Sequence, residues 1–278
     1  MTIAPDSFGF VCDLVRRESA IVLEAGKEYL VESRLLPLAR AQGDADIDAY
    51  VARARRSPHG PVVREIVEAL TTNETSWFRD SEPFVAMRTK LVPELAAARS
   101  TSRRLRVWSA ACSSGQEPYS IAMNLLDAPQ LAGWRLEVLG TDLSLEMVER
   151  CRNGRYSQLE MNRGLPASEL VRWFERDGAA WRVRPELAAV TSFRQLNLVR
   201  PLAPLGQFDL IFLRNVLIYF DLETKRDVLR RLRSLLAPDG YLFMGASETT
   251  MGVDDSWERV PIGRGSVYRI KQSTWKDG

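Results

Sequence analysis

A loop of small residues and two nearby carboxylates are the part of this sequence best suited to bind a ligand. The loop, residues 109–115, follows a short apolar stretch, and Glu117 stands just after it in the first turn of a predicted helix. Asp142 ends the next apolar stretch. Small residues let a backbone turn sharply and let a ligand approach it closely. An aspartate at a strand end can accept hydrogen bonds from both ribose hydroxyls, although Asp142 could instead cap the helix that begins near Ser144.

The loop lacks the glycine patterns of the common nucleotide sites. It is neither Gly-x-Gly-x-x-Gly nor a loop ending in Gly-Lys-Ser/Thr, so we expect neither a dinucleotide nor ATP. S-adenosylmethionine, a nucleoside with a charged amino-acid tail, fits better, because Glu117 would pair with its ammonium group and an arginine with its carboxylate. Asn197 and Arg214 lie near the ends of other predicted strands, and the carboxyl ends of parallel strands share one rim.

The composition excludes several classes of protein. The 278 residues are 45% hydrophobic and 27% charged with a net charge of +2, so we expect no general nucleic-acid-binding surface. We also expect no signal peptide and no membrane insertion, because no basic segment followed by an apolar run and no long apolar stretch occurs. The three cysteines are far apart, which predicts a reducing, cytoplasmic location.

Catalysis by histidine or by a metal is poorly supported. His59 is the only histidine and stands in a predicted surface turn, so it can neither activate a nucleophile nor belong to a metal cluster. We therefore interpret Cys112, within the small-residue loop, as a space-filling residue rather than a nucleophile.

The spacing of apolar residues divides the chain into a helical part and an alternating part. It predicts an all-helical domain over residues 1–72, a polar linker over 73–82, and an α/β domain over 83–278. The α/β domain should hold a parallel, doubly wound sheet with a reversed edge, and a small β-subdomain inserted at residues 165–192. Its predicted strands are residues 105–108, 136–142, 194–198, 208–213, 241–245 and 266–270.

Two polar segments allow a structural and a functional interpretation. Linker residues Asn73, Thr75 and Arg79 could line a cleft between domains, or the segment could be a plain linker anchored by its two aromatic residues. The cluster Arg53, Arg55 and Arg56 is by default a solvated helix face, and alternatively a docking surface for an acidic partner.

Five segments, in order, resemble the CheR family of chemoreceptor glutamate methyltransferases over nearly the whole chain. They are residues 71–79, 108–122, 140–142, 208–220 and 245–248. The resemblance implies a Rossmann-like S-adenosylmethionine methyltransferase domain with an inserted β-subdomain, preceded by a helical domain. It also implies methyl transfer to glutamate carboxylates of receptor cytoplasmic helices in chemotaxis adaptation, giving glutamate methyl esters and S-adenosylhomocysteine.

The resemblance also assigns site residues. Cofactor contacts would come from Asn73, Thr75, Arg79, Glu117, Asp142, Asn197, Leu198, Leu213 and Arg214, and catalytic residues would be Arg79, Arg214 and Tyr219. A glutamate carboxylate is ionised near pH 7 and needs no strong base, so Arg79 and Tyr219 should mainly orient it. Alternatively, Tyr219 packs in a core and Arg214 forms a salt bridge at the rim.

Two departures from the family concern the receptor. The turn at residues 176–180 has a single glycine, so we expect tethering by a receptor C-terminal pentapeptide to be absent or weak. The early basic face retains Arg34 and Arg40 but is thin. We expect a monomer. Alternative functions are methylation of another carboxylate or a small molecule, and a cofactor-binding module that docks on receptors without turnover.

Overall fold

The protein is described from a computed structural model, which covers residues 2–202 and 204–272. The predicted limits at residues 1 and 278 therefore lie outside the described residues. The chain divides into two compact units. The helical unit contains Met1–Thr72 and the segment Tyr219–Thr224, and the α/β unit contains Asn73–Ile218 and Lys225–Gly278.

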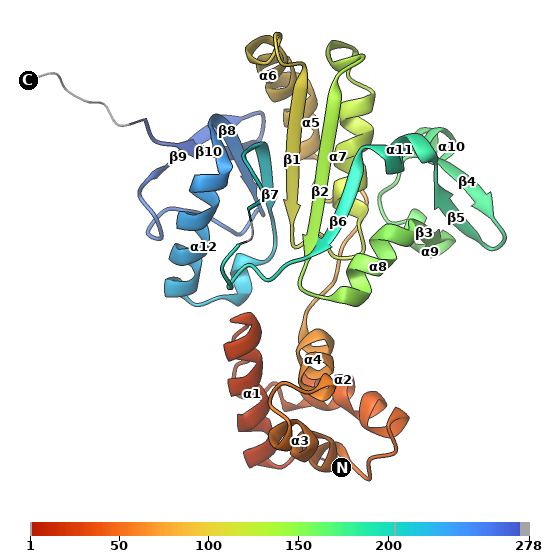
Figure 1. Cartoon of the computed structure of the whole chain (residues 1–278), viewed down its shortest axis with the longest axis vertical. Helices are drawn as coiled ribbons and strands as arrows, with labels where there is room; N and C mark the ends of the chain where they lie inside the picture. The colour runs from red at the N-terminus through yellow and green to blue at the C-terminus, as the bar shows by residue number, and fades with distance from the viewer. Residues whose placement is uncertain (1, 203, 273–278) are drawn as a thin grey trace, which may run out of the picture. The chain divides into compact units, whose positions relative to one another are not determined.

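The helical unit is a bundle of four helices, as its apolar spacing predicts. They are α1 (Pro5–Ser19), α2 (Glu28–Ala41), α3 (Ile47–Arg56) and α4 (Pro61–Leu70) (Figure 1). Proline stands in the first turn of α1 and α4, where its missing N–H costs nothing. The Asp46 carboxylate caps α3 by accepting a hydrogen bond from the Ala49 N–H at 2.8 Å.

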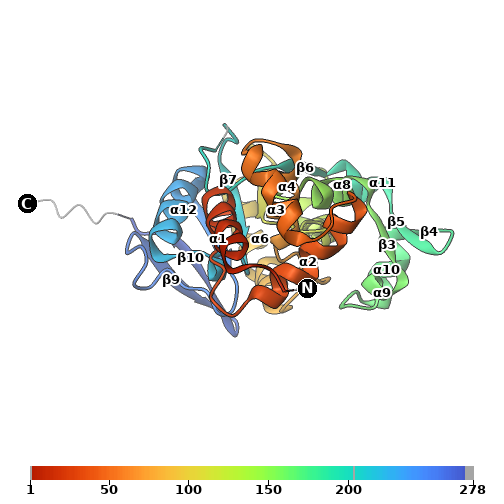
Figure 2. The ribbon, with the colours of Figure 1, turned by 90° about the horizontal axis from the view of Figure 1, so that it is seen from below.

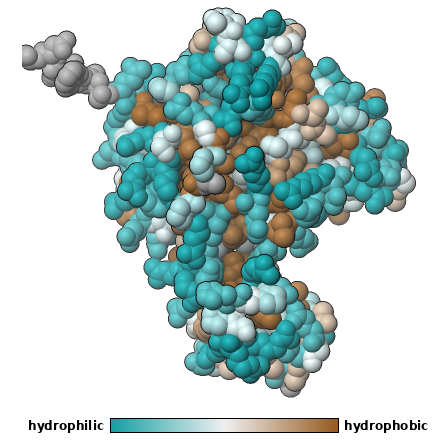
Figure 3. All heavy atoms as spheres, viewed as in Figure 1, coloured by the Kyte–Doolittle hydropathy of each residue, from teal (hydrophilic) through white to brown (hydrophobic). Residues whose placement is uncertain are grey.

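The arginines of the helical unit are largely engaged within it. Arg53 pairs with Asp44 and Arg55 with Asp6, each at 2.7 Å. Arg34 donates to two main-chain carbonyl oxygens at the end of α4. The visible face of this unit is mostly hydrophilic (Figure 3), which favours a solvated surface.

The α/β unit is built on a seven-stranded sheet in the order β6-β2-β1-β7-β8-β10-β9. The strands are β1 (Arg104–Ala110), β2 (Arg135–Asp142), β6 (Thr191–Gln195), β7 (Phe208–Leu213), β8 (Leu236–Met244), β9 (Trp257–Ile262) and β10 (Gly265–Ile270). The first five in the spatial order run parallel, whereas β10 is antiparallel to both β8 and β9. The predicted parallel sheet with a reversed strand is confirmed, although the reversed strand β10 lies one place in from the edge strand β9.

Helices flank this sheet, and apolar residues fill the space between. The segments are α5 (Glu82–Ala86), a π-helical turn (Met87–Leu91), α6 (Val92–Ala98), α7 (Gln116–Leu126), α8 (Leu145–Asn153), α11 (Pro185–Ala189) and α12 (Leu222–Leu235), with 3₁₀ turns at Pro129–Leu131 and Leu217–Tyr219. Strand β7 is buried along its whole length, as a central parallel strand must be. Phe212 on β7 stacks on Phe243 of β8 with ring centroids 4.2 Å apart.

A smaller sheet, in the order β3-β5-β4, lies beyond β6 (Figures 1 and 2). It contains β3 (Arg155–Ser157), β4 (Phe174–Asp177) and β5 (Ala180–Val183). In the sequence, α9 (Gln158–Met161) and α10 (Ala167–Trp173) connect β3 to β4. The sheet thus begins ten residues before the predicted boundary at 165. The Trp77 ring, from the linker, contacts the rings of Tyr156 and Phe174 edge-on.

Three element boundaries differ from those the sequence predicts. Strand β6 ends at Gln195, because its neighbour β2 ends at the paired residue Asp142. Strand β8 begins at Leu236 and passes through a predicted turn, because a register shift opposite Phe208 accommodates the extra residues. The predicted helix over 83–98 is interrupted by the π-helical turn, a feature often found near functional sites.

Adding a methyl group at Gly140 of β2 should destabilise the α/β unit. A Cβ atom there would lie 2.7 Å from the Phe193 ring and 3.1 Å from the Cys112 sulfur. We expect Gly140→Ala to lower the free energy of unfolding by about 1–3 kcal/mol in urea titrations. Gly265→Ala, whose Cβ meets nothing closer than 3.9 Å, is the matched control and should be near neutral. Equal stability of the two variants would contradict this packing.

Candidate functional site

The small-residue loop after β1 turns through strained backbone. Ala111 and Ser113 have φ angles of 62° and 50°, which side chains other than glycine seldom adopt. Gly115, at φ 98°, precedes α7, and a Cβ there would lie 2.8 Å from the Tyr156 hydroxyl oxygen. Such strain is characteristic of ligand sites and of loops held by their surroundings.

Asp142 holds this loop and the one after β2. Its buried carboxylate accepts a hydrogen bond from the Ser113 N–H at 2.7 Å and another from the Ser144 N–H at 3.0 Å. The side chain of Ser144 caps α8 by accepting from the Met147 N–H. Asp142 therefore fixes the loops after β1 and β2 at the carboxyl ends of these strands. Its contact with a ribose stays a prediction.

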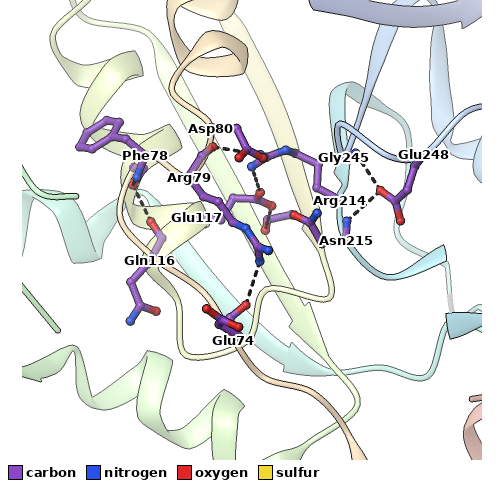
Figure 4. Close-up of polar contacts among 12 residues, drawn as sticks. Glu74, Phe78, Arg79, Asp80, Gln116, Glu117, Arg214, Asn215, Gly245 and Glu248 are labelled. Carbon is purple, nitrogen blue, oxygen red and sulfur yellow. Dashed lines mark hydrogen bonds and ion pairs between the residues drawn. The ribbon is translucent and has the colours of Figure 1, made fainter. Parts of the chain in front are cut away.

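Arg214 and Glu117, predicted separately from the ends of different elements, form a buried ion pair (Figure 4). Arg214 Nη1 donates to Glu117 Oε2 at 2.8 Å, and the Arg214 side chain is only 1% exposed. Arg214 Nη2 donates to Asp80 Oδ2 at 2.7 Å and to the Arg79 carbonyl oxygen at 2.9 Å. Glu117 also accepts from the Ser109 hydroxyl at 2.8 Å. Arg214 thus forms salt bridges at this rim, as the alternative interpretation expects, although its side chain is buried, and its role in the reaction stays a prediction.

The linker is held against the loop and α7. The Asn73 carbonyl oxygen accepts from the Ser113 hydroxyl at 2.6 Å, and the Phe78 N–H donates to the Ser120 hydroxyl at 3.1 Å. The half-buried side chain of Arg79 donates to the Glu74 carbonyl oxygen at 3.0 Å. Thr75 is half-buried in the same segment.

The remaining predicted residues differ in their placement. Asn197 and Leu198 lie in the loop after β6 rather than in a strand, and Asn197 Oδ1 accepts from the Val199 N–H at 3.1 Å. Leu213 is fully buried at the end of β7. Tyr219 groups with the helical unit, where its carbonyl oxygen accepts from the Val22 N–H at 3.0 Å. Its catalytic role remains a prediction.

Sequence reasoning missed two acidic residues of this region. Asp80 follows Arg79 directly, but nothing local indicates that it pairs with an arginine 134 residues away. Glu248 lies in residues 245–248, one of the segments that carry the family resemblance, but no local pattern indicates its role. Asp80, Glu248 and Arg214 line a cavity of about 300 Å³ that extends to the β9–β10 hairpin.

A second cavity, of about 560 Å³, lies between the linker and α7. Its lining includes Asp127 and Glu169, and partial burial raises the pKa of both carboxyl groups. Among residues 2–202 and 204–272, no cluster of His, Cys, Asp and Glu side chains could hold a metal. No helix in the described part of the chain is long and apolar enough to span a membrane.

Cys112 of the loop and Cys151 of α8 should be unreactive in the folded protein. The Cys112 and Cys151 sulfurs lie 3.9 Å apart and are almost completely buried. The hydrogen bond between them, together with burial, raises the pKa of the Cys112 thiol well above its usual value, so little reactive thiolate forms. At pH 8, iodoacetamide should modify only the half-buried Cys12, and mass spectrometry should show all three cysteines modified after unfolding. Rapid modification of Cys112 in the native protein would contradict this placement.

A double-mutant cycle should detect the buried ion pair. Combining Glu117→Ala with Arg214→Ala should give a coupling free energy of roughly 1.5–3 kcal/mol in unfolding experiments, because each partner compensates a buried charge. The exposed pair Asp227 and Arg230 on α12, with side chains 42% and 71% exposed, is the control. Its coupling should stay below about 0.5 kcal/mol. Similar values for both pairs would show that burial adds nothing.

Comparison with known proteins covers both units. Residues 6–71 match the CheR methyltransferase all-alpha domain, and residues 73–265 match the CheR methyltransferase SAM binding domain. The chain is 41% identical to chemotaxis protein methyltransferase Cher2 of Pseudomonas putida, with 92% of this chain and 95% of the relative aligned. It is also 41% identical to chemotaxis protein methyltransferase 1 of Pseudomonas aeruginosa, covering 98% and 100% of the two chains. The chain therefore belongs to the CheR methyltransferase family.

Proposed function

We propose that this protein transfers the methyl group of S-adenosylmethionine to glutamate carboxylates in the cytoplasmic helices of a chemoreceptor. The products are glutamate methyl esters and S-adenosylhomocysteine, and the reaction serves chemotaxis adaptation. The observation that carries this proposal is the buried Glu117–Arg214 pair beside the loop after β1, in a chain whose relatives are named chemotaxis protein methyltransferases. We further propose that the protein acts as a cytoplasmic monomer.

The residues present fit the cofactor. Arg214 Nε is buried without a hydrogen-bond partner among the described residues, so it can still donate to a ligand carboxylate. The glycine at position 115 keeps the turn into α7 free of a side chain where the loop is tightest. Glu117 would bind the ammonium group and Asp142 the ribose, with further contacts from Asn73, Thr75, Asn197, Leu198 and Leu213.

The charges of the site also suit this ligand. Arg214 pairs with two carboxylates, those of Asp80 and Glu117, which gives this group of three side chains a formal charge of −1. S-adenosylmethionine, when bound, supplies a methyl group on a positively charged sulfur. A site with one excess negative charge favours this cation over the uncharged thioether that remains after transfer.

The chain's own contribution is orientation. The acceptor carboxylate is ionised near neutral pH and needs no base. Arg214 adds little net charge, since Glu117 and Asp80 compensate it. Among the described residues, the Arg79 guanidinium donates to one carbonyl oxygen only, that of Glu74. Its remaining N–H groups are therefore available to align a carboxylate with the methyl carbon. Tyr219 would complete this alignment.

Incubation with isotope-labelled cofactor tests the proposed reaction. Label should appear on glutamates of a receptor cytoplasmic fragment as a base-labile methyl ester, identified by mass spectrometry. Label on a small molecule or on another carboxylate would point to a different methyltransferase. Cofactor binding without transfer to any receptor fragment would point to a docking module.

Two variants should separate binding from turnover. Asp142→Ala should weaken cofactor binding by roughly 10- to 100-fold in calorimetric titrations, because charged hydrogen bonds are lost. Arg79→Ala should lower kcat about 100-fold while the cofactor Kd changes less than about threefold. Arg230→Ala, at an exposed site on α12, is the control and should match the wild type. Normal methylation by Arg79→Ala would refute its catalytic assignment.

A truncated receptor tests whether methylation depends on docking of the receptor's C-terminal pentapeptide. The β4–β5 turn is short, with Gly178 its only glycine, so we propose that it offers no pentapeptide site. Removing the last five residues of the receptor should leave KM within about threefold of the intact value, because no second attachment raises the local concentration. A rise of tenfold or more would show that tethering operates.

A further inference from the structure

Glu248 binds four main-chain N–H groups with one carboxylate. Its side chain lies just after β8, and the residue is 8% exposed. Oε2 accepts from the N–H groups of Gly245 at 2.7 Å and Asn215 at 2.8 Å. Oε1 accepts from those of Val216 at 2.9 Å and Leu217 at 2.7 Å. Figure 4 shows the Glu248 carboxylate between the loops that follow β7 and β8.

Three of the four donors are consecutive residues directly after Arg214. Consecutive N–H groups converge on one point in a tight turn or at the start of a helix, and such a nest binds an anion. Here the turn requires Asn215 to adopt a φ of 59°. Asparagine adopts this left-handed conformation more readily than other residues with a side chain, so the sequence permits the turn. Glu248 supplies the anion that the turn encloses.

The loop after β8 is shaped to let Glu248 reach this turn. A Cβ at Gly245 would lie 2.6 Å from the Glu248 carboxylate and 2.8 Å from the Asn215 side-chain nitrogen. Glycine therefore allows the two loops to close on each other. Each of the two Glu248 carboxylate oxygens accepts hydrogen bonds from two main-chain N–H groups.

Arg214 is thus fixed from two sides. Its guanidinium is held by Glu117 and Asp80, and the backbone that follows it is held by Glu248. We propose that Glu248 is a positioning residue for methyl transfer, which acts by fixing the turn that carries Arg214. This inference rests on the function proposed above, because it concerns the same site.

The proposal requires a carboxylate and not merely a polar side chain of the same size. In Glu248→Gln, one oxygen becomes an NH₂ group, which must face two N–H donors that it cannot accept. The turn should therefore open although the side-chain volume is unchanged. If Glu248 had only a general structural role, Glu248→Gln would destabilise the folded protein but would leave the turn after β7 and the rate of methyl transfer unaffected.

Asp209→Asn provides the matched control for a buried carboxylate. Asp209 is 7% exposed, accepts from the Arg106 N–H at 2.8 Å and pairs with Arg99 at 2.9 Å. It lies near the start of β7, whereas Arg214 follows the end of the same strand. Its substitution should lower the thermal unfolding midpoint without changing the turn after β7.

The experiment measures amide hydrogen exchange of residues 214–218 together with kcat, KM and the cofactor Kd for the wild type and both variants. We expect Glu248→Gln to speed exchange of these amides at least about tenfold and to lower kcat about 10- to 100-fold. The cofactor Kd should rise as well, but by a smaller factor than kcat falls, because Arg214 is also assigned to the cofactor carboxylate. Asp209→Asn should leave exchange and kcat at their wild-type values.

Each outcome decides the inference. Unchanged exchange in Glu248→Gln would overturn it, as would faster exchange with unchanged kcat. Equal losses of kcat in both variants would show a merely structural role. If the wild type does not methylate the receptor fragment, the proposed function fails, and amide exchange alone then decides whether Glu248 holds the turn.

Discussion

The buried charge of Arg214 is the constraint on which the rest of the site depends. A guanidinium that is 1% exposed is very costly unless carboxylates compensate it, and here Glu117 and Asp80 do so. These partners come from the start of α7 and from the linker, while Arg214 itself follows β7. The ion pairs therefore determine how three segments, far apart in sequence, meet at the carboxyl ends of the strands.

Backbone strain is concentrated in these same segments. Apart from Ala20 and Arg103, every non-glycine residue with positive φ in the described chain lies in the linker, the loop after β1 or the turn after β7; these residues are Phe78, Asp80, Ser81, Ala111, Ser113 and Asn215. Hydrogen bonds to the carboxylates of Asp142 and Glu248 hold two of these segments. A site built this way is organised before its ligand arrives, which reduces the cost of ordering it on binding.

Local sequence patterns predicted the fold well but predicted the site only in part. The apolar run of β7 and the placement of Asp142 and Glu117 followed from periodicity and loop chemistry. The Arg214–Glu117 pair joins residues 97 apart, and no local pattern reports such a contact. The end of β6 is set by its neighbour β2, so Asn197 was assigned to a strand although it lies in a loop. Glu248 acts on main-chain groups, and these carry no sequence signal at all.

A crystal structure with S-adenosylhomocysteine bound tests the central claim most directly, namely that the Glu117–Arg214 network and Asp142 form the cofactor site. The account predicts that the ammonium group of the product lies within about 3 Å of Glu117 and the ribose hydroxyls within the same distance of Asp142. Binding in the cavity between the linker and α7, or a tail remote from Glu117, would contradict it.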